Sequence, residues 1–425
     1  MMVRGKIGAA LRVVLALTLG VALAYIAPDA RAQTKEPIKI GFSMALSGGL
    51  SPNGKAALLA MQIWEADQNA KGGLLGRPVK LVYYDDQTDA STVPGIYTKL
   101  LDVDKVDLVV GPYGTNMIAP AMPVIIQHKM TFIGLLGLAV NSAFNYPNYF
   151  AMIPSGPSPK EAFTKGFYDI ALAQNPKPKT VAIVGADAEF SKNLTDGARN
   201  SAQALGLQIV YDKSYPPTTT DYAPIMRAIN ATNPDLIVVG SYPPDTVGMI
   251  NALGEVGTSA KLFGGGMVGL QNTSLKTKLG PLLNGVVNYD FWLPGPKMEF
   301  PGAEAVLKKY QAQAVAAGVD PLGYYMTTFA YAYLQIMADA VTKTGGLDQQ
   351  KIADYIRATT FHTITGDVKF GAGGEWAQSR VLQVQFQHVT SNDVEQFKGT
   401  KKTVIVAPAQ YKSGNAIYPL SAARK

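Results

Sequence analysis

A glycine-rich segment close to the start of the chain is the first place where residue types and spacing could do chemistry. Gly49, Gly54 and Lys55 satisfy most of the phosphate-loop pattern G-x-x-x-x-G-K-[ST]. The next residue is Ala56, so the hydroxyl that would hold magnesium is missing, and Pro52 removes one N–H group from such a cradle. A strand precedes this segment and a helix follows it. The free N–H groups of the helix start therefore favour a carboxylate or a neutral group over a phosphate.

Other reactive side chains are few and scattered. Cysteine is absent, which excludes a disulfide framework, a thiol nucleophile, thiolate metal ligands and a lipid-modified N-terminal cysteine. His128, His362 and His388 lack the spacing of a zinc site, and the chain has no G-x-S-x-G motif. Asp85 and Asp86 resemble a paired-carboxylate site, although a turn at a strand end explains them equally well. An exported hydrolase is therefore only a remote alternative, and the sequence indicates neither an enzyme nor a metal or cofactor site.

The N-terminus has the pattern of a secretory signal peptide. Arg4, Lys6 and Arg12 precede an apolar run at 13–26, and a small-x-small cleavage site ends at Ala32. The run is shorter than a comfortable membrane span, and an uncleaved anchor is the alternative. We predict a signal peptide over 1–32 and a soluble mature protein exported to the periplasm.

Composition indicates an ordinary globular chain. The net charge is +7, and loss of four cations and one anion with the signal peptide leaves +4 without any block of like charge, which gives no indication of a nucleic-acid partner. Hydrophobic residues make up 47% of the chain, enough to build a sizeable core without disulfides. The mature chain exceeds the ~250–300 residues at which single cores stop growing, so we expect two domains.

Two successive runs of alternating strands and helices follow the N-terminus. Such alternation predicts parallel sheets covered by helices on both faces, with ligands bound at the carboxyl ends of the strands. The C-terminal part differs, with two helices followed by antiparallel strands and glycine-rich turns. Strands are expected near residues 38–42, 79–84, 106–110, 131–136, 180–184, 207–211, 236–240, 262–264, 286–289, 366–371, 381–388 and 403–407.

In this order the motifs resemble those of type I periplasmic solute-binding proteins of ABC transporters, in particular the leucine/isoleucine/valine-binding (branched-chain amino acid type) family. The similar segments are Ile-Gly-Phe-Ser-Met-Ala-Leu-Ser-Gly from residue 40, Asn-Ala-Lys-Gly-Gly-Leu-Leu-Gly-Arg-Pro-Val from residue 69, Tyr-Asp-Asp from residue 84, Val-Gly-Pro from residue 110 and Thr-Gly-Asp-Val-Lys-Phe from residue 365. The resemblance covers essentially the whole mature chain.

The resemblance implies an α/β fold of two Rossmann-like lobes joined by a three-segment hinge, with the ligand between them. The crossings are expected near residues 152–156, 284–288 and 363–368. Lobe one then comprises residues 36–152 and 287–364. Lobe two comprises residues 153–286 and 365–425.

The resemblance also implies where lobe one holds the ligand. In the family, a Ser/Thr hydroxyl and neighbouring N–H groups after the third strand grip a carboxylate. Thr115 occupies that position here, with Tyr113 and Asn116 beside it. Without the resemblance, Thr115 would equally well be a simple helix N-cap. Asn53, from the first loop, is expected to reach over the ligand.

The second lobe carries the principal departure from the family pattern. Phe190 and Tyr242 are the expected aromatic contacts. Amino-acid-binding relatives place a carboxylate where Gly266 stands, and a threonine that assists the ammonium where Leu138 stands, beside Leu136 in an apolar segment. A buried ammonium without a partner is unfavourable. The site is therefore expected to take a carboxylate that lacks an α-amino group, or a neutral apolar ligand.

Three carboxylates in neighbouring loops, Asp187, Glu189 and Asp245, could replace the missing one. The resemblance further implies a monomeric binding protein that delivers a small molecule to ABC permease subunits in the inner membrane. A ligand-sensing module of the same fold, feeding a receptor or regulator, is the alternative.

Overall fold

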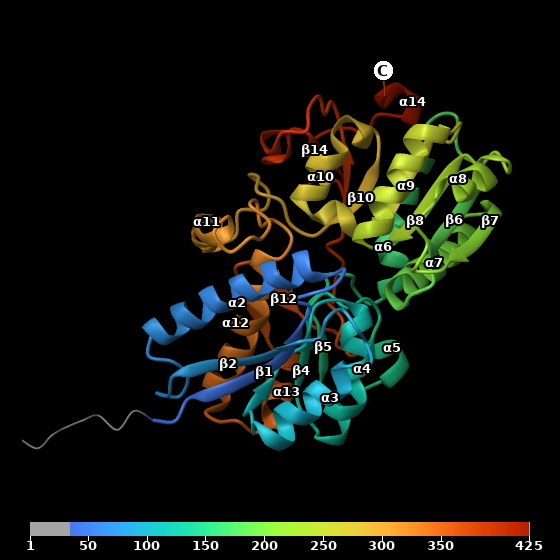
Figure 1. Ribbon diagram of the computed structural model, residues 1–425. Helices are drawn as coiled ribbons and strands as arrows, with labels where there is room; N and C mark the ends of the chain where they lie inside the picture. Colours follow the sequence, from blue (N-terminus) through green and yellow to red (C-terminus); the bar gives the residue numbers. More distant parts are fainter. Residues whose placement is uncertain (1–34, 425) are drawn as a thin grey trace, which may run out of the picture. The chain divides into compact units, whose positions relative to one another are not determined.

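The computed structural model describes residues 35–424, and the predicted signal peptide lies outside the described residues. A compact unit begins at Ile38, and all of the following applies to it. This unit is α/β and is built around two principal parallel-rich sheets, as the sequence predicts (Figure 1). No helix among the described residues is long and apolar enough to cross a membrane.

The first sheet has the order β2-β1-β3, with all pairs parallel. A second parallel pair, β4 and β5, continues it through a bridge between Tyr113 and Leu135 and a hydrogen bond from Gly111 N to Ile133 O of 2.8 Å. The side chains of β1 are almost all buried. The strand bounds are β1 Ile38–Met44, β2 Val79–Asp85, β3 Leu108–Val109, β4 Phe132–Gly134 and β5 Tyr149–Ala151.

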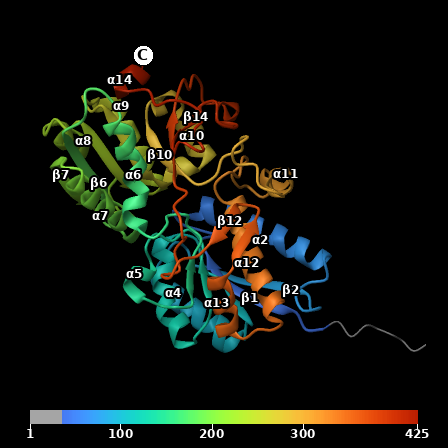
Figure 2. The ribbon, with the colours of Figure 1, turned by 180° about the vertical axis from the view of Figure 1, so that it is seen from behind.

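Helices from both ends of the chain cover this sheet. The long helix α12 packs against α2, although more than 250 residues separate them in sequence, and α3 packs against α4 (Figures 1 and 2). The bounds are α2 Ser51–Ala70, α3 Val93–Thr98 with the π-helix η1 Lys99–Val103, α4 Thr115–Gln127, α5 Asn141–Phe144, α11 Ala303–Ala314, α12 Thr327–Thr344 and α13 Gln349–Ala358.

The second sheet has seven strands in the order β14-β13-β10-β9-β8-β6-β7. Its strands from β6 to β10 are parallel, and β13 and β14 run antiparallel at one side, in agreement with the predicted antiparallel tail. The bounds are β6 Thr180–Ala186, β7 Gln208–Tyr215, β8 Leu236–Ser241, β9 Leu262–Met267, β10 Val287–Asp290, β13 Leu382–Phe386 and β14 Thr403–Ala407; the separate hairpin comprises β11 Thr360–Thr363 and β12 Gly366–Lys369.

The helices of the second sheet pack in pairs, α6 with α7 and α8 with α9. Figure 2 shows α6 and α7 alongside β6 and β7. The bounds are α6 Pro159–Leu172, α7 Glu189–Ala204, α8 Ala223–Asn230, α9 Pro243–Val256, α10 Thr273–Leu279 and α14 Leu420–Ala423, with the 3-10 turns η2 Val268–Gln271, η3 Gly280–Leu283 and η4 Val394–Phe397.

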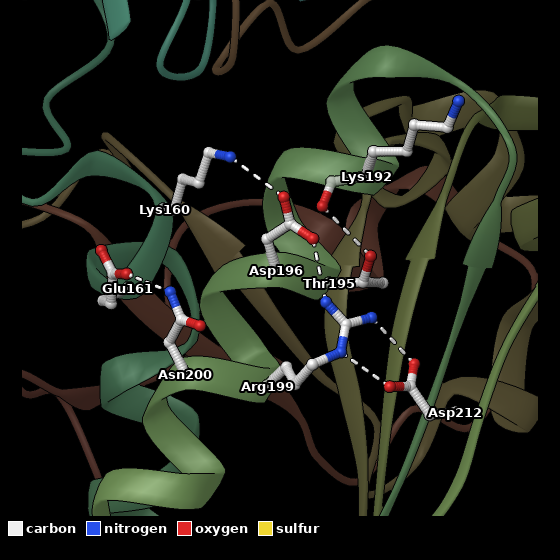
Figure 3. A network of polar contacts seen from close by, with 8 residues as sticks. All are labelled: Lys160, Glu161, Lys192, Thr195, Asp196, Arg199, Asn200 and Asp212. Carbon is white, nitrogen blue, oxygen red and sulfur yellow. Dashed lines mark hydrogen bonds and ion pairs between the residues drawn. The ribbon is translucent and has the colours of Figure 1, made fainter.

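A polar network on the surface ties α6 and α7 to the edge strand β7 (Figure 3). Asp196 accepts hydrogen bonds from Lys160 Nζ at 3.0 Å and from Arg199 Nη1 at 2.9 Å. Arg199 also donates from Nε and Nη2 to both carboxylate oxygens of Asp212, at 2.7 and 2.9 Å. The two-point Arg199–Asp212 contact fixes the geometry of the network, because a planar guanidinium matches a carboxylate edge.

The pairing of β10 bears on where the lobes divide. Val287 to Asp290 hydrogen-bonds with β9 and β13, so this strand is part of the seven-stranded sheet. The predicted boundary placed residues 287–364 in lobe one. We therefore propose that the second crossing follows Asp290, and that the other two crossings lie near residues 152–156 and 363–368 as predicted.

Candidate functional site

The carboxyl ends of strands from both sheets meet around one small cavity. The β3–α4 turn, the end of β4 and the starts of α7 and α9 all contribute to its wall, together with residues from α6, β10 and the turn before α12. About 20 Å³ of free space remains inside, enough for about one water molecule. A larger ligand therefore requires its walls to move apart. The lining residues are Leu50, Tyr113, Gly114, Thr115, Asn116, Leu136, Ile153, Phe163, Phe190, Tyr242, Val268, Tyr289 and Tyr325.

Thr115 is the first residue of α4 and is 2% exposed. Gly114, not Thr115, caps the helix, with a φ of 88°. The Thr115 hydroxyl oxygen accepts a hydrogen bond from Leu138 N at 2.9 Å, which leaves its proton available to a second partner. The first N–H groups of a helix have no acceptor within the helix. The hydroxyl and the helix start therefore form a group of donors suited to a carboxylate.

Asn116 joins elements of the two sheets across the cavity. Its side-chain oxygen accepts from Tyr242 OH at 2.8 Å and from Phe190 N at 3.1 Å. A third hydrogen bond runs from Asn193 Nδ2 to Leu138 O at 3.1 Å. These contacts hold the start of α4 and the segment after β4 against the starts of α7 and α9, so they must break when the cavity opens.

Aromatic rings form another part of the cavity wall. Phe190 lies edge-on to Phe163 at a centroid distance of 5.6 Å and to Tyr242 at 6.0 Å, and Phe163 lies 4.6 Å from Tyr289. Such rings offer apolar faces and edges to a flat or branched apolar group. The predicted contacts Phe190 and Tyr242 therefore belong to a larger aromatic cluster.

Three tyrosine hydroxyls meet at the same cavity. Tyr325 OH lies 3.2 Å from Tyr289 OH and 3.4 Å from Tyr113 OH. Burial raises the pKa of Tyr113, Tyr289 and Tyr325, so all three hydroxyls are neutral at physiological pH. They supply hydrogen bonds without charge, and the described lining contains no acidic or basic side chain.

Gly266, where the resemblance implies a carboxylate in amino-acid-binding relatives, lies against apolar side chains. A Cβ atom on Gly266 would lie 1.9 Å from Leu194 Cδ1 and 3.4 Å from Phe190 Cζ. Leu194 and Phe190 thus fill the space with apolar atoms. Charge and volume both oppose an ammonium group here.

The three candidate replacement carboxylates point to other partners. Asp187 pairs with Lys192 Nζ at 2.7 Å on the surface, and Glu189 is exposed. Asp245 is buried, and accepts hydrogen bonds from Tyr242 N at 2.7 Å and Tyr215 OH at 2.5 Å. Burial raises the pKa of Asp245 to about 6, although these hydrogen bonds act to lower it. None of the three lines the cavity.

Of the predicted site residues, Tyr113, Thr115, Asn116, Leu136, Phe190 and Tyr242 line the cavity. Leu138 lies behind Thr115 as its hydrogen-bond donor, and Gly266 lies behind Phe190. Asn53 is elsewhere: it is buried in the first turn of α2 and accepts from Asn272 Nδ2 at 2.9 Å. Sequence reasoning missed Phe163, Tyr289 and Tyr325, which lie in or beside regular elements and have no loop signal.

Comparison with known proteins identifies the family. The sequence pattern of the family described as "Periplasmic binding protein" matches residues 37–391. The "Leu/Ile/Val-binding protein homolog 2" of Brucella abortus (strain 2308) is 24% identical over 355 residues, which cover 82% of this chain and 90% of that protein. The chain therefore belongs to the periplasmic binding protein family, in its type I, branched-chain amino acid group.

Solved structures share the fold. The substrate binding protein LivJ of a branched-chain amino acid transporter from Streptococcus pneumoniae, in complex with isoleucine, has a TM-score of 0.69 at 19% identity and covers 90% of this chain and 100% of its own. A solute binding protein of an ABC transporter from R. palustris, in complex with benzoate, has a TM-score of 0.68 at 17% identity, with coverages of 84% and 94%. Similar proteins thus hold both an amino acid and an aromatic acid.

Proposed function

We propose that this protein is a periplasmic substrate-binding protein that captures a small apolar or aromatic carboxylate without an α-amino group and delivers it to the permease subunits of an ABC transporter. The observation that carries the proposal is the composition of the cavity wall. A hydroxyl and helix N–H groups suited to a carboxylate stand at one end, and aromatic rings stand around them. No carboxylate in the described lining can neutralise an ammonium.

The family supports the wider part of the proposal, since its members are binding proteins rather than enzymes. The N-terminal pattern supports export, and we propose that residues 1–32 are removed as a signal peptide. The benzoate-bound relative supports an acid without an amino group as the ligand class. Entry of such a ligand requires the two lobes to separate about the hinge and to close again, because the cavity is nearly filled.

Matched pairs of ligands test the ligand class directly. 4-Methylpentanoate differs from L-leucine only by the α-amino group, and 3-phenylpropanoate differs from L-phenylalanine in the same way. Calorimetry on the mature protein should show the deaminated member binding at least about tenfold more tightly, because an unpaired buried ammonium costs several kcal/mol. Tighter binding of either amino acid would refute the proposed ligand class. Failure of a wider panel of small acids to bind would refute the function itself.

A further inference from the structure

A second concavity lies outside the predicted ligand cavity and shares no residue with it. It is an open groove of about 700 Å³, between the β11–β12 hairpin and the segments that precede β13 and follow β14. Phe300, Trp376 and Tyr411 give it aromatic walls, and Lys369 and Arg380 are its cations. Its size falls in the range of small-molecule sites.

Arg380 is the unusual residue of this groove. The residue is 6% exposed, and its guanidinium carbon lies over the ring of Trp376, 5.0 Å from the ring centroid, and over the ring of Phe300, 5.1 Å from the centroid. Nη2 donates to Thr365 Oγ1 at 2.9 Å, and Nε is buried without an acceptor. No carboxylate of the described residues forms an ion pair with Arg380. Buried charges are ordinarily paired, so this guanidinium lacks its usual anion.

The surroundings add donors and little negative charge. Trp376 Nε1 is also buried without an acceptor. Lys369 Nζ is held beside the groove by the carbonyls of residues 357 and 358, at 2.9 and 2.6 Å. The carboxylate of Asp367 is paired with His362 Nδ1 at 2.6 Å. Burial raises the pKa of the nearby Glu375 to about 8, so this carboxyl is mostly neutral at pH 7.

We propose that this groove is a binding site for a small oxyanion, a carboxylate or a sulfate-like group, held on the edge of the Arg380 guanidinium. The N–H groups of a guanidinium point outward in its plane, so we expect the anion at this edge, beside the rings of Phe300 and Trp376. Thr365 occupies only one of these N–H groups. Aromatic walls also accommodate an organic anion with an apolar body.

The site also touches the segments where the chain is predicted to cross between lobes. Arg380 N donates to Pro154 O at 2.8 Å, within the first predicted crossing, and the side chain bonds to Thr365, within the third. An anion here therefore binds at the hinge. The inference does not depend on the ligand proposed for the main cavity.

The indole N–H signals of the mature protein provide a direct test. The chain has three tryptophans, and Trp376 is assigned by Trp376→Phe. The Trp292 indole donates to Met298 O at 2.9 Å and serves as an internal reference. Sodium sulfate and sodium acetate are titrated separately in nitrogen-15-resolved spectra, at ionic strength held constant with sodium chloride. We expect a saturable shift of the Trp376 signal with at least one of the two salts. The ratio of the two apparent dissociation constants shows whether the groove prefers a carboxylate or a sulfate.

Variants separate an anion site from a purely structural arginine. Arg380→Gln should abolish the saturable shift, and Arg380→Lys should weaken it severalfold, because a lysine keeps the charge but not the planar edge. Arg357→Gln is the matched control, since Arg357 also lies over a ring, that of Phe150 at 5.1 Å, outside the groove. A wild-type protein whose Trp376 signal responds to sulfate and acetate only as it does to chloride would overturn the proposal, whether or not the variants fold.

Discussion

Replacement of Thr115 by valine tests the carboxylate end of the cavity. Valine keeps the shape of the side chain and removes the hydroxyl. In the structure that hydroxyl accepts from Leu138 N at 2.9 Å, and its proton is available to a ligand. The substitution therefore removes the hydrogen bond from Leu138 N in the protein and the proposed hydrogen bond to the ligand in the complex. The first loss is measured as a change in the free energy of unfolding and the second as a change in affinity.

The expected changes in affinity and in stability follow from the two hydrogen bonds that are lost. Hydrogen bonds to charged groups contribute about 1.5–3 kcal/mol, so a carboxylate ligand should bind roughly ten- to a hundredfold more weakly. Leu138 N–H is left buried without an acceptor, which should lower the free energy of unfolding by about 1–3 kcal/mol. A helix cap is not lost, because Gly114 is the capping residue. Thr115→Ser keeps the hydroxyl and should retain most of the affinity.

Calorimetry with the tightest acid from the matched ligand panel, and denaturant unfolding of the same proteins, give the two quantities. Loss of affinity in the valine variant and its retention in the serine variant would support the assignment. Equal affinity of the valine variant and the wild type, for a ligand whose carboxylate is essential, would refute it. The first turn of α2 would then be the next candidate for the anion.

Three further predictions follow from charge and volume. Glu375→Gln removes a buried carboxyl whose pKa burial raises from 4.5 to about 8. The pKa of this carboxyl is higher in the folded state than in the unfolded state. Between about pH 4.5 and 8 the carboxyl therefore ionises more readily in the unfolded state, and the free energy of unfolding of the wild type falls as pH rises. Denaturant unfolding should therefore show that the free energy of unfolding of the variant rises relative to that of the wild type over this range. The relative gain should be on the order of a few kcal/mol above pH 8 and absent below pH 4.5. Arg199→Gln should lower stability by about 0.5–1 kcal/mol at low salt and less at 1 M salt, whereas Lys308→Gln, which breaks an exposed pair, should have no measurable effect. Gly266→Asp alone should not confer leucine binding in calorimetry, because Leu194 occupies the space next to Gly266. The double variant that also carries Leu194→Ala is expected to bind leucine.

The sequence could predict the parts of the site that follow strands. Thr115 follows β3, Phe190 follows β6 and Tyr242 follows β8, and the carboxyl ends of parallel strands share one edge of a sheet. Leu136 follows β4 in the same way. The α/β fold is predicted by the alternation of strands and helices and is confirmed. The resemblance implies these site residues, and their position after strands explains why they gather around one cavity.

The aromatic residues inside regular elements could not be predicted in this way. Phe163 lies in α6 and Tyr289 in β10, where an aromatic side chain is most often part of the core. Tyr325 lies just before α12, a helix that packs on α2. Their approach to the cavity depends on the packing of different helices and strands against one another, and local spacing carries no information about it.

The start of α2 differs from the sequence prediction for a related reason. The sequence predicted a helix only after the glycine-rich segment that contains Gly49, Gly54 and Lys55, but the helix begins at Ser51 and Pro52 lies in its first turn. Proline is tolerated there, because the N–H group it lacks would have no partner within the helix. Asn53 is consequently a buried helical residue bonded to Asn272, not a loop residue that reaches over the ligand.

The proposed selectivity against amino acids involves packing as well as charge. If Gly266 merely lacked a carboxylate, one substitution would restore an ammonium site. The structure instead places Leu194 Cδ1 1.9 Å from the position of a Cβ atom on Gly266, so the volume that a carboxylate would need is already filled. Leu194 is fully buried in α7, the helix whose start also carries Phe190. A side chain at Gly266 would therefore require the Leu194 side chain to change its conformation. The same helix closes the cavity through the hydrogen bond from Phe190 N to Asn116 Oδ1, so the proposed preference for an acid without an amino group and the closure of the cavity both involve α7.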